Sequence, residues 1–389
     1  MTQRSQSKPT SVAVVYNNTG VDHYEQLRET DPATLNFTPV YSLRVATIQE
    51  EYHAIVHALQ TEGYQVTLLN IEDDLSRLQR LLSQDAPDVI FNLVEMFHGD
   101  PQLESAIAGL FDLYEITYTG SAPFALELCQ RKAITKQVLM KQGIATPGYR
   151  LLRLPRVPRV HGLRYPLIVK PASEDASLGV EARSVVYDYG QLVSRVKAVF
   201  ESFKPPILVE EFIPGKELHV AVLGNERPQV LPIIEFDFSE LPDDHPAIIT
   251  YDVKWNPPDQ AYHKVHAICP AQLTEKVEQI VKDQALQAFQ ATLCRDYARI
   301  DMRLTESDTP CVLEVNPNPD LTESVSFMQS AERAGLSFSQ TLAKIVEFAL
   351  ARGKKRRVQL ARQAPQTPDI SVPASDPRPP TSERKRESE

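Results

Sequence analysis

The chain has 389 residues, and its apolar content of 42% is enough for two or three domains with real cores. No stretch approaches the roughly 18 consecutive apolar residues of a membrane span. The formal charge of −10 becomes about −15 once the basic segment from residue 352 onward is set aside, which argues against a nucleic-acid partner. The four cysteines are scattered and form no CxxC pair, and no secretory signal opens the chain, so we expect a cytoplasmic enzyme.

Strand and helix patterns alternate in the first part of the chain. Apolar, β-branched runs at residues 11–16, 64–69 and 88–94 predict strands, and residues 45–60 carry apolar positions at helical spacing. This alternation predicts a parallel, doubly wound sheet whose functional loops follow the strand C-termini. The loops after the first and third runs contain Asn17 and His98.

A helix is predicted at residues 104–114, and a single long helical pattern covers residues 124–142. Lys132 and Lys136 lie four residues apart in the long pattern, so both ammonium groups fall on one helix face. Lysines placed in this way are usually solvated. The basic, proline-bearing residues 151–163 are typical of a connector.

A short apolar strand then ends in Lys170 and is followed by a loop of small residues that includes Ser177. An ammonium group at the end of a buried strand needs an anionic partner, and a phosphate is a natural one. The loop could cover that phosphate through backbone N–H groups. It does not match the GxxxxGK[ST] pattern, which argues against a P-loop fold.

Residues 207–223 predict a strand, a Pro-Gly turn and a second strand, which by themselves indicate an ordinary hairpin. Backbone groups beside Glu210, Glu211 and Ile213 could read an adenine edge, and the Glu217 carboxylate could accept hydrogen bonds from a ribose. Farther along, Lys254 lies in a polar, proline-rich segment whose composition suits a lid.

The most informative stretch runs from Tyr297 to Asp320, after a long amphipathic helix at residues 273–293. Alternating residues predict two strands joined by a short turn, with one polar face built from Arg299, Asp301, Glu314 and Asn316. Two carboxylates, an amide and a guanidinium suit a hard cation such as Mg2+ and its accompanying anion. The alternative is a solvated hairpin face.

Residues 327–350 close the predicted folded body, and the composition then changes. The segment from Arg352 to Glu389 holds ten Lys or Arg residues against five Asp or Glu residues, with six prolines between Pro365 and Pro380. A segment with so few large apolar residues is expected to be disordered.

Separated pieces of the chain follow the order FN…HG, YTGS, a helix lysine, IVKPA, VEEFIPGKE, KW, ARID and LEVN. This order resembles the ATP-grasp superfamily, and specifically its D-alanine–D-alanine ligase branch, over about residues 11–350. The resemblance implies an α/β chain, α+β in its C-terminal part, with an ATP-grasp fold after an N-terminal doubly wound domain. The expected parts are a flexible N-terminus (1–10), the N-terminal domain (11–120), a central lobe (121–215), a C-terminal lobe with the metal site (216–351) and a disordered basic tail (352–389).

The resemblance also implies a role for each matching residue. The ATP phosphates would be held by Lys132, Lys170 and the loop that contains Ser177. Adenine would be contacted by the stretch that contains Glu210, Glu211 and Ile213, and ribose by Glu217. Two Mg2+ ions, with Mn2+ as an alternative metal, would bind Asp301, Glu314 and Asn316. The catalytic groups would be Lys254, reaching a terminal phosphate, and Arg299, facing the reacting carbonyl oxygen.

The substrate side departs from the family pattern. Family ligases carry a glutamate in a glycine-rich first loop to hold the substrate's ammonium group, whereas the loop at Asn17 has no acidic residue before Asp22. His98 is kept without its usual acidic, glycine-rich continuation, and Asp320 replaces the glycine of a Pro-Gly pair. Losing a buried ammonium partner would cost on the order of 2–5 kcal/mol, enough to exclude the standard amino acid. We therefore take Asn17, His98 and Asp320 as candidate substrate residues.

Three functions stay open at this point. The first is an ATP-dependent carboxylate–amine ligase for an amino acid, peptide or small metabolite other than a pair of D-alanines. The second is D-alanyl-D-alanine synthesis itself, and the third is a non-catalytic, nucleotide-binding regulator that uses its basic tail to bind a partner. The expected partners are small-molecule carboxylates and amines, and the family's habit of pairing implies a homodimer.

Overall fold

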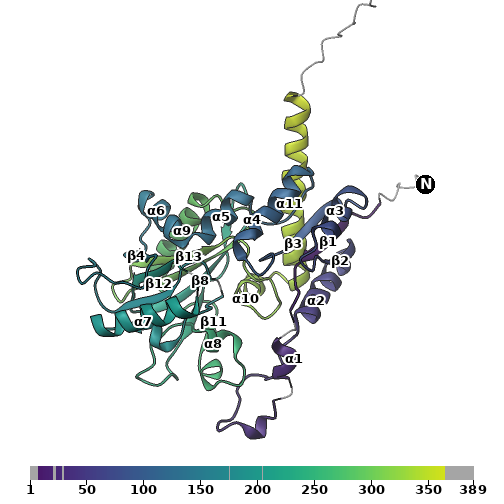
Figure 1. Cartoon of the computed structure of the whole chain (residues 1–389). Coiled ribbons are helices and arrows are strands. Elements are labelled where there is room, and N and C mark those ends of the chain that lie inside the picture. Colours follow the sequence, from purple (N-terminus) through teal and green to yellow (C-terminus); the bar gives the residue numbers. More distant parts are fainter. Residues whose placement is uncertain (1–7, 21–22, 29, 175, 204, 364–389) are drawn as a thin grey trace, which may run out of the picture.

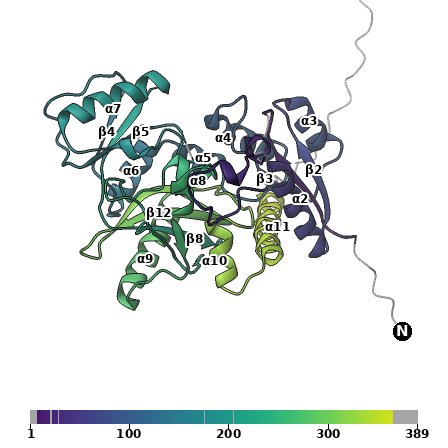
Figure 2. The same ribbon diagram turned by 90° about the horizontal axis from the view of Figure 1, so that it is seen from below.

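The computed structural model describes residues 8–20, 23–28, 30–174, 176–203 and 205–363 (Figure 1). Its named strands form sheets of three, four and six strands. Seen from below, the three-stranded sheet lies on one side, the four-stranded sheet on the other, and the six-stranded sheet between them (Figure 2). No helix in the described part of the chain combines the length and apolar character that crossing a membrane requires.

The N-terminal sheet contains the predicted strands in the parallel order β2-β1-β3, namely β1 (Ser11–Tyr16), β2 (Gln65–Asn70) and β3 (Val89–Leu93). Alternate residues of β1 enter different cores. Val12 and Val14 pack with α2 (Ile48–Thr61), while Ala13 and Val15 pack with α3 (Leu75–Ser83) and α4 (Glu104–Leu113). Both faces are therefore covered, which confirms the doubly wound sheet. Short helices occupy the connecting loops at α1 (His23–Leu27), η1 (Pro32–Thr34) and η2 (Pro101–Leu103).

The prediction of one long helix over residues 124–142 is wrong. The segment forms two helices, α5 (Pro123–Gln130) and α6 (Lys132–Lys141), because Arg131 between them has φ −90° and ψ 71°. The Thr135 hydroxyl donates to the Leu128 carbonyl at 2.6 Å and thereby satisfies one carbonyl at the end of α5. The break makes Lys132 the first residue of α6.

The four-stranded sheet has the order β4-β7-β5-β6 and is covered by α7 (Tyr189–Ser202). Its strands are β4 (Tyr149–Leu152), β5 (Leu167–Pro171), β6 (Val185–Val186) and β7 (Ile207–Glu211), with η3 (Ala182–Ser184) before β6. The predicted connector at residues 151–163 thus begins inside a strand. Pairing between β4 and β7 supplies the partner that the local sequence does not reveal.

The six-stranded sheet is antiparallel and has the order β11-β10-β8-β12-β13, with β9 paired to β8. Helix α9 (Glu275–Ala291) packs on its apolar face. The strands are β8 (Lys216–Leu223), β9 (Gln229–Val230), β10 (Ile234–Asp237), β11 (His266–Ile268), β12 (Tyr297–Leu304) and β13 (Pro310–Asn316). Two short helices, α8 (Tyr251–Trp255) and η4 (Gln260–His263), lie between β10 and β11.

The expectation of a hairpin at residues 207–223 is wrong, because β7 and β8 belong to different sheets. The Pro-Gly turn carries the chain from one sheet to the other. Gly215 has φ +124°, and a Cβ placed there would lie 2.0 Å from the Leu304 carbonyl oxygen. Only glycine fits this crossing without displacing β12.

The C-terminal helices are α10 (Ser326–Arg333) and α11 (Phe338–Gln363). The predicted disordered tail from residue 352 is wrong for its first twelve residues, because α11 continues through Gln363 and projects beyond the sheets (Figure 1). Tertiary contacts explain the continuation: Arg352 donates to the Tyr118 carbonyl at 2.9 Å and pairs with buried Asp296. The predicted tail residues 364–389 and N-terminal residues 1–7 lie outside the described residues.

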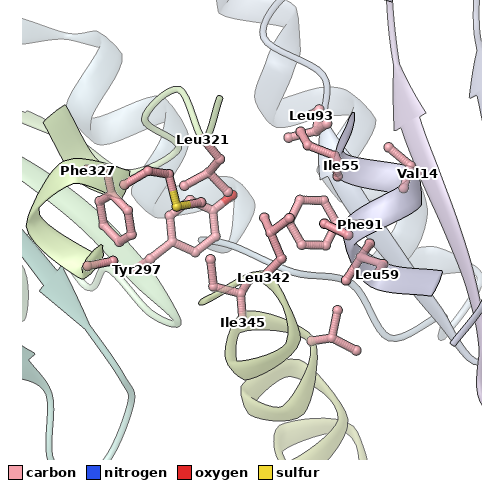
Figure 3. Packing of buried hydrophobic residues seen from close by; sticks show 14 of the residues in the cluster. Val14, Ile55, Leu59, Phe91, Leu93, Tyr297, Leu321, Phe327, Leu342 and Ile345 are labelled. Carbon is pink, nitrogen blue, oxygen red and sulfur yellow. The ribbon is translucent and has the colours of Figure 1, made fainter. Parts of the chain in front are cut away.

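One apolar core joins the two ends of the chain. Val14 and Phe91 of the N-terminal sheet contact a cluster that includes Tyr297 of β12 and Leu342 and Ile345 of α11 (Figure 3). Helix α11 therefore completes the core of the N-terminal sheet, although it lies more than 200 residues away in the sequence.

Candidate active site

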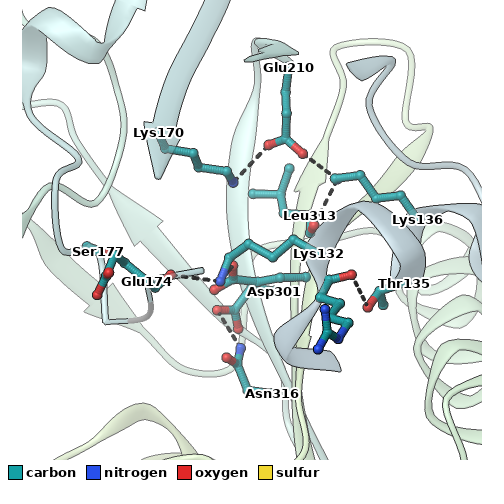
Figure 4. Close-up of polar contacts among 12 residues, drawn as sticks. Lys132, Thr135, Lys136, Lys170, Glu174, Ser177, Glu210, Asp301, Leu313 and Asn316 are labelled. Atoms are coloured by element: carbon teal, nitrogen blue, oxygen red, sulfur yellow. Dashed lines mark hydrogen bonds and ion pairs between the residues drawn. The ribbon is translucent and has the colours of Figure 1, made fainter. Parts of the chain in front are cut away.

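The polar face of β12 and β13 forms as predicted. Arg299 lies opposite Asn316, and Asp301 lies opposite Glu314. The Arg299 guanidinium donates to both Asp301 carboxylate oxygens, at 2.7 and 2.9 Å. The Asn316 amide donates to the same carboxylate at 3.0 Å (Figure 4). Arg299 and Asp301 are each only 7% exposed, so the solvated-face alternative is wrong.

Lys132 brings the start of α6 to this face. Its ammonium group lies 3.6 Å from a Glu314 carboxylate oxygen and donates to the Glu174 carbonyl at 2.9 Å. Burial alone would raise the pKa of Glu314, but the positive charges of Lys132, Lys170 and Arg299 together outweigh burial and lower it. Glu314 is therefore ionised at neutral pH. Lys132 and Lys136 are both buried, so the usual solvated reading of such lysines is wrong for this helix.

Glu210 is held between two lysines. Its carboxylate pairs with Lys136 at 2.7 Å and with Lys170 at 2.8 Å, and its side chain is 1% exposed (Figure 4). Burial opposes the negative charge, yet the two ammonium groups lower the pKa of Glu210 to about 2. The anion that Lys170 meets in the free protein is thus a carboxylate. Lys136 also donates to the Leu313 carbonyl at 3.0 Å, which ties α6 to β13.

The other residues that the sequence assigns to adenine or ribose contact arginines of the protein itself. The Glu211 side chain binds Arg164 at 3.1 Å, and the Ile213 carbonyl accepts from Arg303 at 2.9 Å. Arg303 also donates to Glu217 at 2.8 Å, and burial raises the pKa of Glu217 despite this positive partner. Arg303 therefore holds the crossing between the two sheets in place.

The lid segment contacts the small-residue loop directly. Trp255 of α8 donates its indole N–H to the Ala176 carbonyl at 2.8 Å, and the Ser177 hydroxyl donates to the Ile249 carbonyl at 3.2 Å. Lys254 lies 5.0 Å from the Trp255 ring centre. Burial, followed by the positive charge of Arg299, lowers the pKa of Lys254. Lys254 therefore lies within electrostatic reach of the β12 face.

The candidate substrate residues divide into two groups. Asn17 and His98 meet at Asp73, whose carboxylate accepts from the Asn17 amide at 2.7 Å and from the His98 backbone N–H at 2.7 Å. Asp320 lies in the loop after β13, where its side chain accepts from the Thr322 backbone N–H at 2.8 Å. The structure thus joins the first two residues and places Asp320 in a separate turn.

Two residues at the site were missed by sequence reasoning. Asp73 follows β2 in an acidic turn, and only its contacts reveal its role. His219 lies opposite Asp301 on β8, with one ring nitrogen 3.7 Å from the Asp301 carboxylate and the other 2.9 Å from the Ser326 hydroxyl. The sequence could have indicated His219, because residues two positions apart on a strand lie on the same face of the sheet, and His219 follows Glu217 by two.

The donor set on β12 and β13 fits a hard cation. Among the described residues no three His, Cys, Asp or Glu side chains gather into a metal cluster. Asp301 and Glu314 nevertheless face each other across paired strands, and Asn316 adds an amide whose oxygen can ligate once it turns away from its contact with Asp301. Carboxylate and amide oxygens are the ligands that Mg2+ prefers.

The two larger sheets, the buried lysines and the carboxylate face between them define an ATP-grasp enzyme. The family model of the D-ala D-ala ligase C-terminus matches residues 139–347. A D-alanine–D-alanine ligase from Syntrophotalea carbinolica is 33% identical over 77% of this chain and 90% of its own length. The chain belongs to the D-alanine–D-alanine ligase family of ATP-grasp ligases, which form C–N bonds with ATP and a divalent metal ion such as Mg2+.

One further sequence relative and two solved structures are similar to this chain. An uncharacterised protein from Sinorhizobium fredii is 32% identical over 76% of this chain and 86% of its own length. The D-alanine–D-alanine ligase from Bacillus anthracis complexed with ATP superposes with a TM-score of 0.67 at 23% identity, covering 90% of this chain and 100% of that structure. A D-Ala:D-Ser ligase from Enterococcus faecalis gives a TM-score of 0.63 at 19% identity, covering 88% and 100%.

Proposed function

We propose that this ligase joins a carboxylate to an amine through an acyl phosphate, and that its substrate is an amino acid, peptide or related metabolite other than a pair of D-alanines. The observation that carries the reaction is the buried face on which Arg299, Asp301, Glu314 and Asn316 meet Lys132. The substrate assignment rests on Asn17 and Asp320, where the chain departs from the family pattern. We also propose a cytoplasmic location and a homodimer.

The nucleotide occupies the space between the two larger sheets in this proposal. Lys132 and Lys170 bind its phosphates, and the loop at Ser177 covers them. The backbone around Glu210, Glu211 and Ile213 contacts adenine, and Glu217 accepts from ribose. The existing ion pairs support these roles, because Glu210 orients Lys170 and Glu314 orients Lys132 before a phosphate arrives.

The metal site consists of Asp301, Glu314 and Asn316 and holds two Mg2+ ions, with Mn2+ as an alternative. Bound metal would neutralise the charge that develops on the transferred phosphoryl group. Both carboxylates are suited to a metal before one binds. The lowered pKa of Glu314 keeps its carboxylate charged, and the contact with Arg299 fixes the orientation of Asp301.

The reaction has two steps. A carboxylate oxygen of the first substrate attacks the γ-phosphorus of ATP, the bond from that phosphorus to the oxygen retained by ADP breaks, and ADP is released. The amine nitrogen then attacks the acyl carbon, the bond from that carbon to the bridging oxygen breaks, and inorganic phosphate leaves and takes up the proton that the nitrogen loses. Arg299 stabilises the tetrahedral oxyanion, and Lys254 binds the terminal phosphate. Closure of α8 protects the acyl phosphate from water.

The substrate side supports a donor other than D-alanine. Asn17 offers an amide where the family places a carboxylate, and this amide is already bonded to Asp73. Asp320 adds a negative charge where the family places glycine, so a substrate carboxylate at that point would be repelled. The same fold is found in a D-Ala:D-Ser ligase, which supports variation of substrate on this scaffold.

Synthesis of D-alanyl-D-alanine is the second candidate, and the 33% identity to a D-alanine–D-alanine ligase favours it. The third candidate, a non-catalytic regulator, is disfavoured by the complete polar face of β12 and β13, because a nucleotide-binding module needs no oxyanion-stabilising arginine. Part of the basic segment is also engaged with the body, through Arg352 to Asp296 and Arg356 to Asp112.

Phosphate release from ATP and Mg2+ across a panel of carboxylate and amine pairs tests the proposal. We expect turnover with at least one pair other than D-alanine with itself, and amide formation confirmed by mass spectrometry. Strong turnover with D-alanine alone would establish the second candidate. Measurable ATP binding without turnover by any pair would establish the third.

A further inference from the structure

The N-terminal unit reaches across to the lid. Residues 37–41, here called the strap, lie between η1 and α2 and contact the lid segment, residues 249–266. Figure 1 shows the purple segment around α1 beside the green segment that carries α8. The backbone N–H groups of Val40 and Tyr41 donate to one atom of the lid, the Nδ1 of His263, at 3.2 and 3.0 Å.

These contacts fix the tautomer of His263. Its Nε2 lies 2.8 Å from the Pro257 carbonyl oxygen, so Nε2 carries the proton and donates. Its Nδ1 then has a free lone pair, which the two strap N–H groups share. His263 is 2% exposed and lies between aromatic rings, 5.2 Å from Phe37 and 5.9 Å from Tyr41 between ring centres. One nitrogen thus holds the lid and the other holds the strap.

The lid continues from His263 to the nucleotide side. Helix α8 carries Lys254 and Trp255, and Trp255 donates to the Ala176 carbonyl at 2.8 Å. The Tyr251 backbone N–H donates to the Val180 carbonyl at 3.0 Å. A continuous series of contacts therefore runs from the strap through the lid to the loop that contains Ser177.

We propose that His263 is a positioning residue that fastens the strap to the lid and thereby holds Lys254 over the nucleotide. The inference rests on the proposed phosphate-binding role of Lys254. The strap belongs to the N-terminal unit, which also carries the candidate substrate residues Asn17 and His98. The contact between strap and lid therefore couples closure of the lid over ATP to the part of the protein that would bind the substrate. Without this contact the buried Nδ1 of His263 loses both of its donors, the backbone N–H groups of the exposed residues Val40 and Tyr41, and an unpaired buried acceptor disfavours the closed arrangement.

Two conservative variants separate the two halves of the contact. His263→Asn keeps an acceptor at the δ position for the strap but loses the donor to Pro257. His263→Gln keeps a donor at the ε position but removes the δ acceptor. In the full chain with Mg2+ and a non-hydrolysable ATP analogue, we measure hydrogen exchange of residues 30–45 and the dissociation rate of a fluorescent ATP analogue.

We expect His263→Gln to raise strap exchange at least tenfold and to speed analogue dissociation about fivefold, while His263→Asn stays within twofold of the wild type. Tyr41→Phe removes the hydroxyl contacts of the strap to Val265 and His266 but keeps both backbone N–H donors to His263, so its increase in strap exchange should be smaller than that of His263→Gln. Equal effects of the Asn and Gln variants, or no effect of either, would overturn the proposal.

Lys254→Met distinguishes this inference from the proposed function. That variant should speed analogue dissociation without changing strap exchange. If Lys254→Met binds the analogue normally while His263→Gln still frees the strap, the assigned role of Lys254 is wrong but the fastening is real. If strap exchange in His263→Gln equals that of the wild type, the fastening itself is absent.

Discussion

At the residue scale, Glu314 is the most direct test of the metal site. Glu314→Gln keeps the side-chain shape but removes one charge that faces Asp301 and Lys132. We expect kcat to fall at least 100-fold because the metal loses an anionic ligand, and the apparent Mg2+ requirement to rise. Phosphate release measured over a Mg2+ series checks this. Normal activity at ordinary Mg2+ concentration would show that Glu314 is not a ligand.

Arg299 tests the stabilisation of the oxyanion. Arg299→Lys retains a positive charge beside Asp301 but cannot reproduce the two-point contact. We expect turnover to fall about 100- to 1,000-fold while the dissociation constant of ATP, measured by calorimetry, changes less than threefold. A parallel loss of ATP binding would mean that Arg299 acts on the nucleotide instead.

Glu210 gives a prediction that depends on pH. Its pKa is about 2 in the fold against an ordinary value of 4.5, so its ionised form stabilises the fold above about pH 4.5 and this contribution is lost as pH falls toward 2. The shift corresponds to on the order of 3 kcal/mol. Glu210→Gln should be strongly destabilised at pH 7, because Lys136 and Lys170 lose their buried partner.

Urea unfolding of the wild type and Glu210→Gln between pH 7 and pH 2.5 measures this contribution. The difference in unfolding free energy should be constant down to about pH 4.5 and should then shrink, since other carboxyl groups titrate equally in both proteins. A difference that stays constant to pH 2.5 would contradict the lowered pKa.

At the element scale, Gly215 decides how the chain passes between the two larger sheets. Gly215→Ala would set a Cβ against the Leu304 carbonyl in a left-handed region, and we expect a loss of at least ~2 kcal/mol in unfolding free energy. Gly63→Ala is the matched control, because Gly63 has φ +87° with no atom within 4 Å of the added carbon. That control should lose only ~1 kcal/mol. Equal losses would show that crowding at Leu304 is unimportant.

At the scale of the whole molecule, Arg352 joins α11 to the rest of the fold. Its partner Asp296 is fully buried and also accepts from the Gly120 N–H at 2.9 Å and from the Asn225 amide at 2.8 Å. Arg352→Ala leaves a buried carboxylate without its cation, so we expect a loss of about 2–4 kcal/mol by urea unfolding.

Lys355→Ala serves as the comparison, because Lys355 and its partner Glu226 are mostly exposed. Exposed ion pairs contribute little to stability, so the unfolding free energy of this variant should lie within ~0.5 kcal/mol of the wild-type value. If both variants have the same stability, the Arg352 contact contributes no more than a surface pair.

The sequence predicted those parts of the fold that local pattern controls. Strand β1 follows from its continuous apolar, β-branched run, and the β12–β13 hairpin follows from alternation. The errors arose where side-chain contacts that no periodicity reveals decide the structure. Residues 124–142 are helical throughout by periodicity, but Thr135 captures the Leu128 carbonyl and Arg131 breaks the helix. Residues 352–363 are polar by composition and yet stay helical beside Asp296.

The sequence by itself placed Arg299, Asp301, Glu314 and Asn316 on one face of two adjacent strands, because this needs only period-two geometry. The type of chemistry followed from the order of motifs that the chain shares with the ATP-grasp family. The tertiary structure decided what each of these groups faces. It buried Lys132 and Lys136, paired Lys170 with Glu210, and brought Asp73 to Asn17 and His98. Those contacts join residues many positions apart, and their energies depend on burial and distance, which exist only once the sheets have packed together.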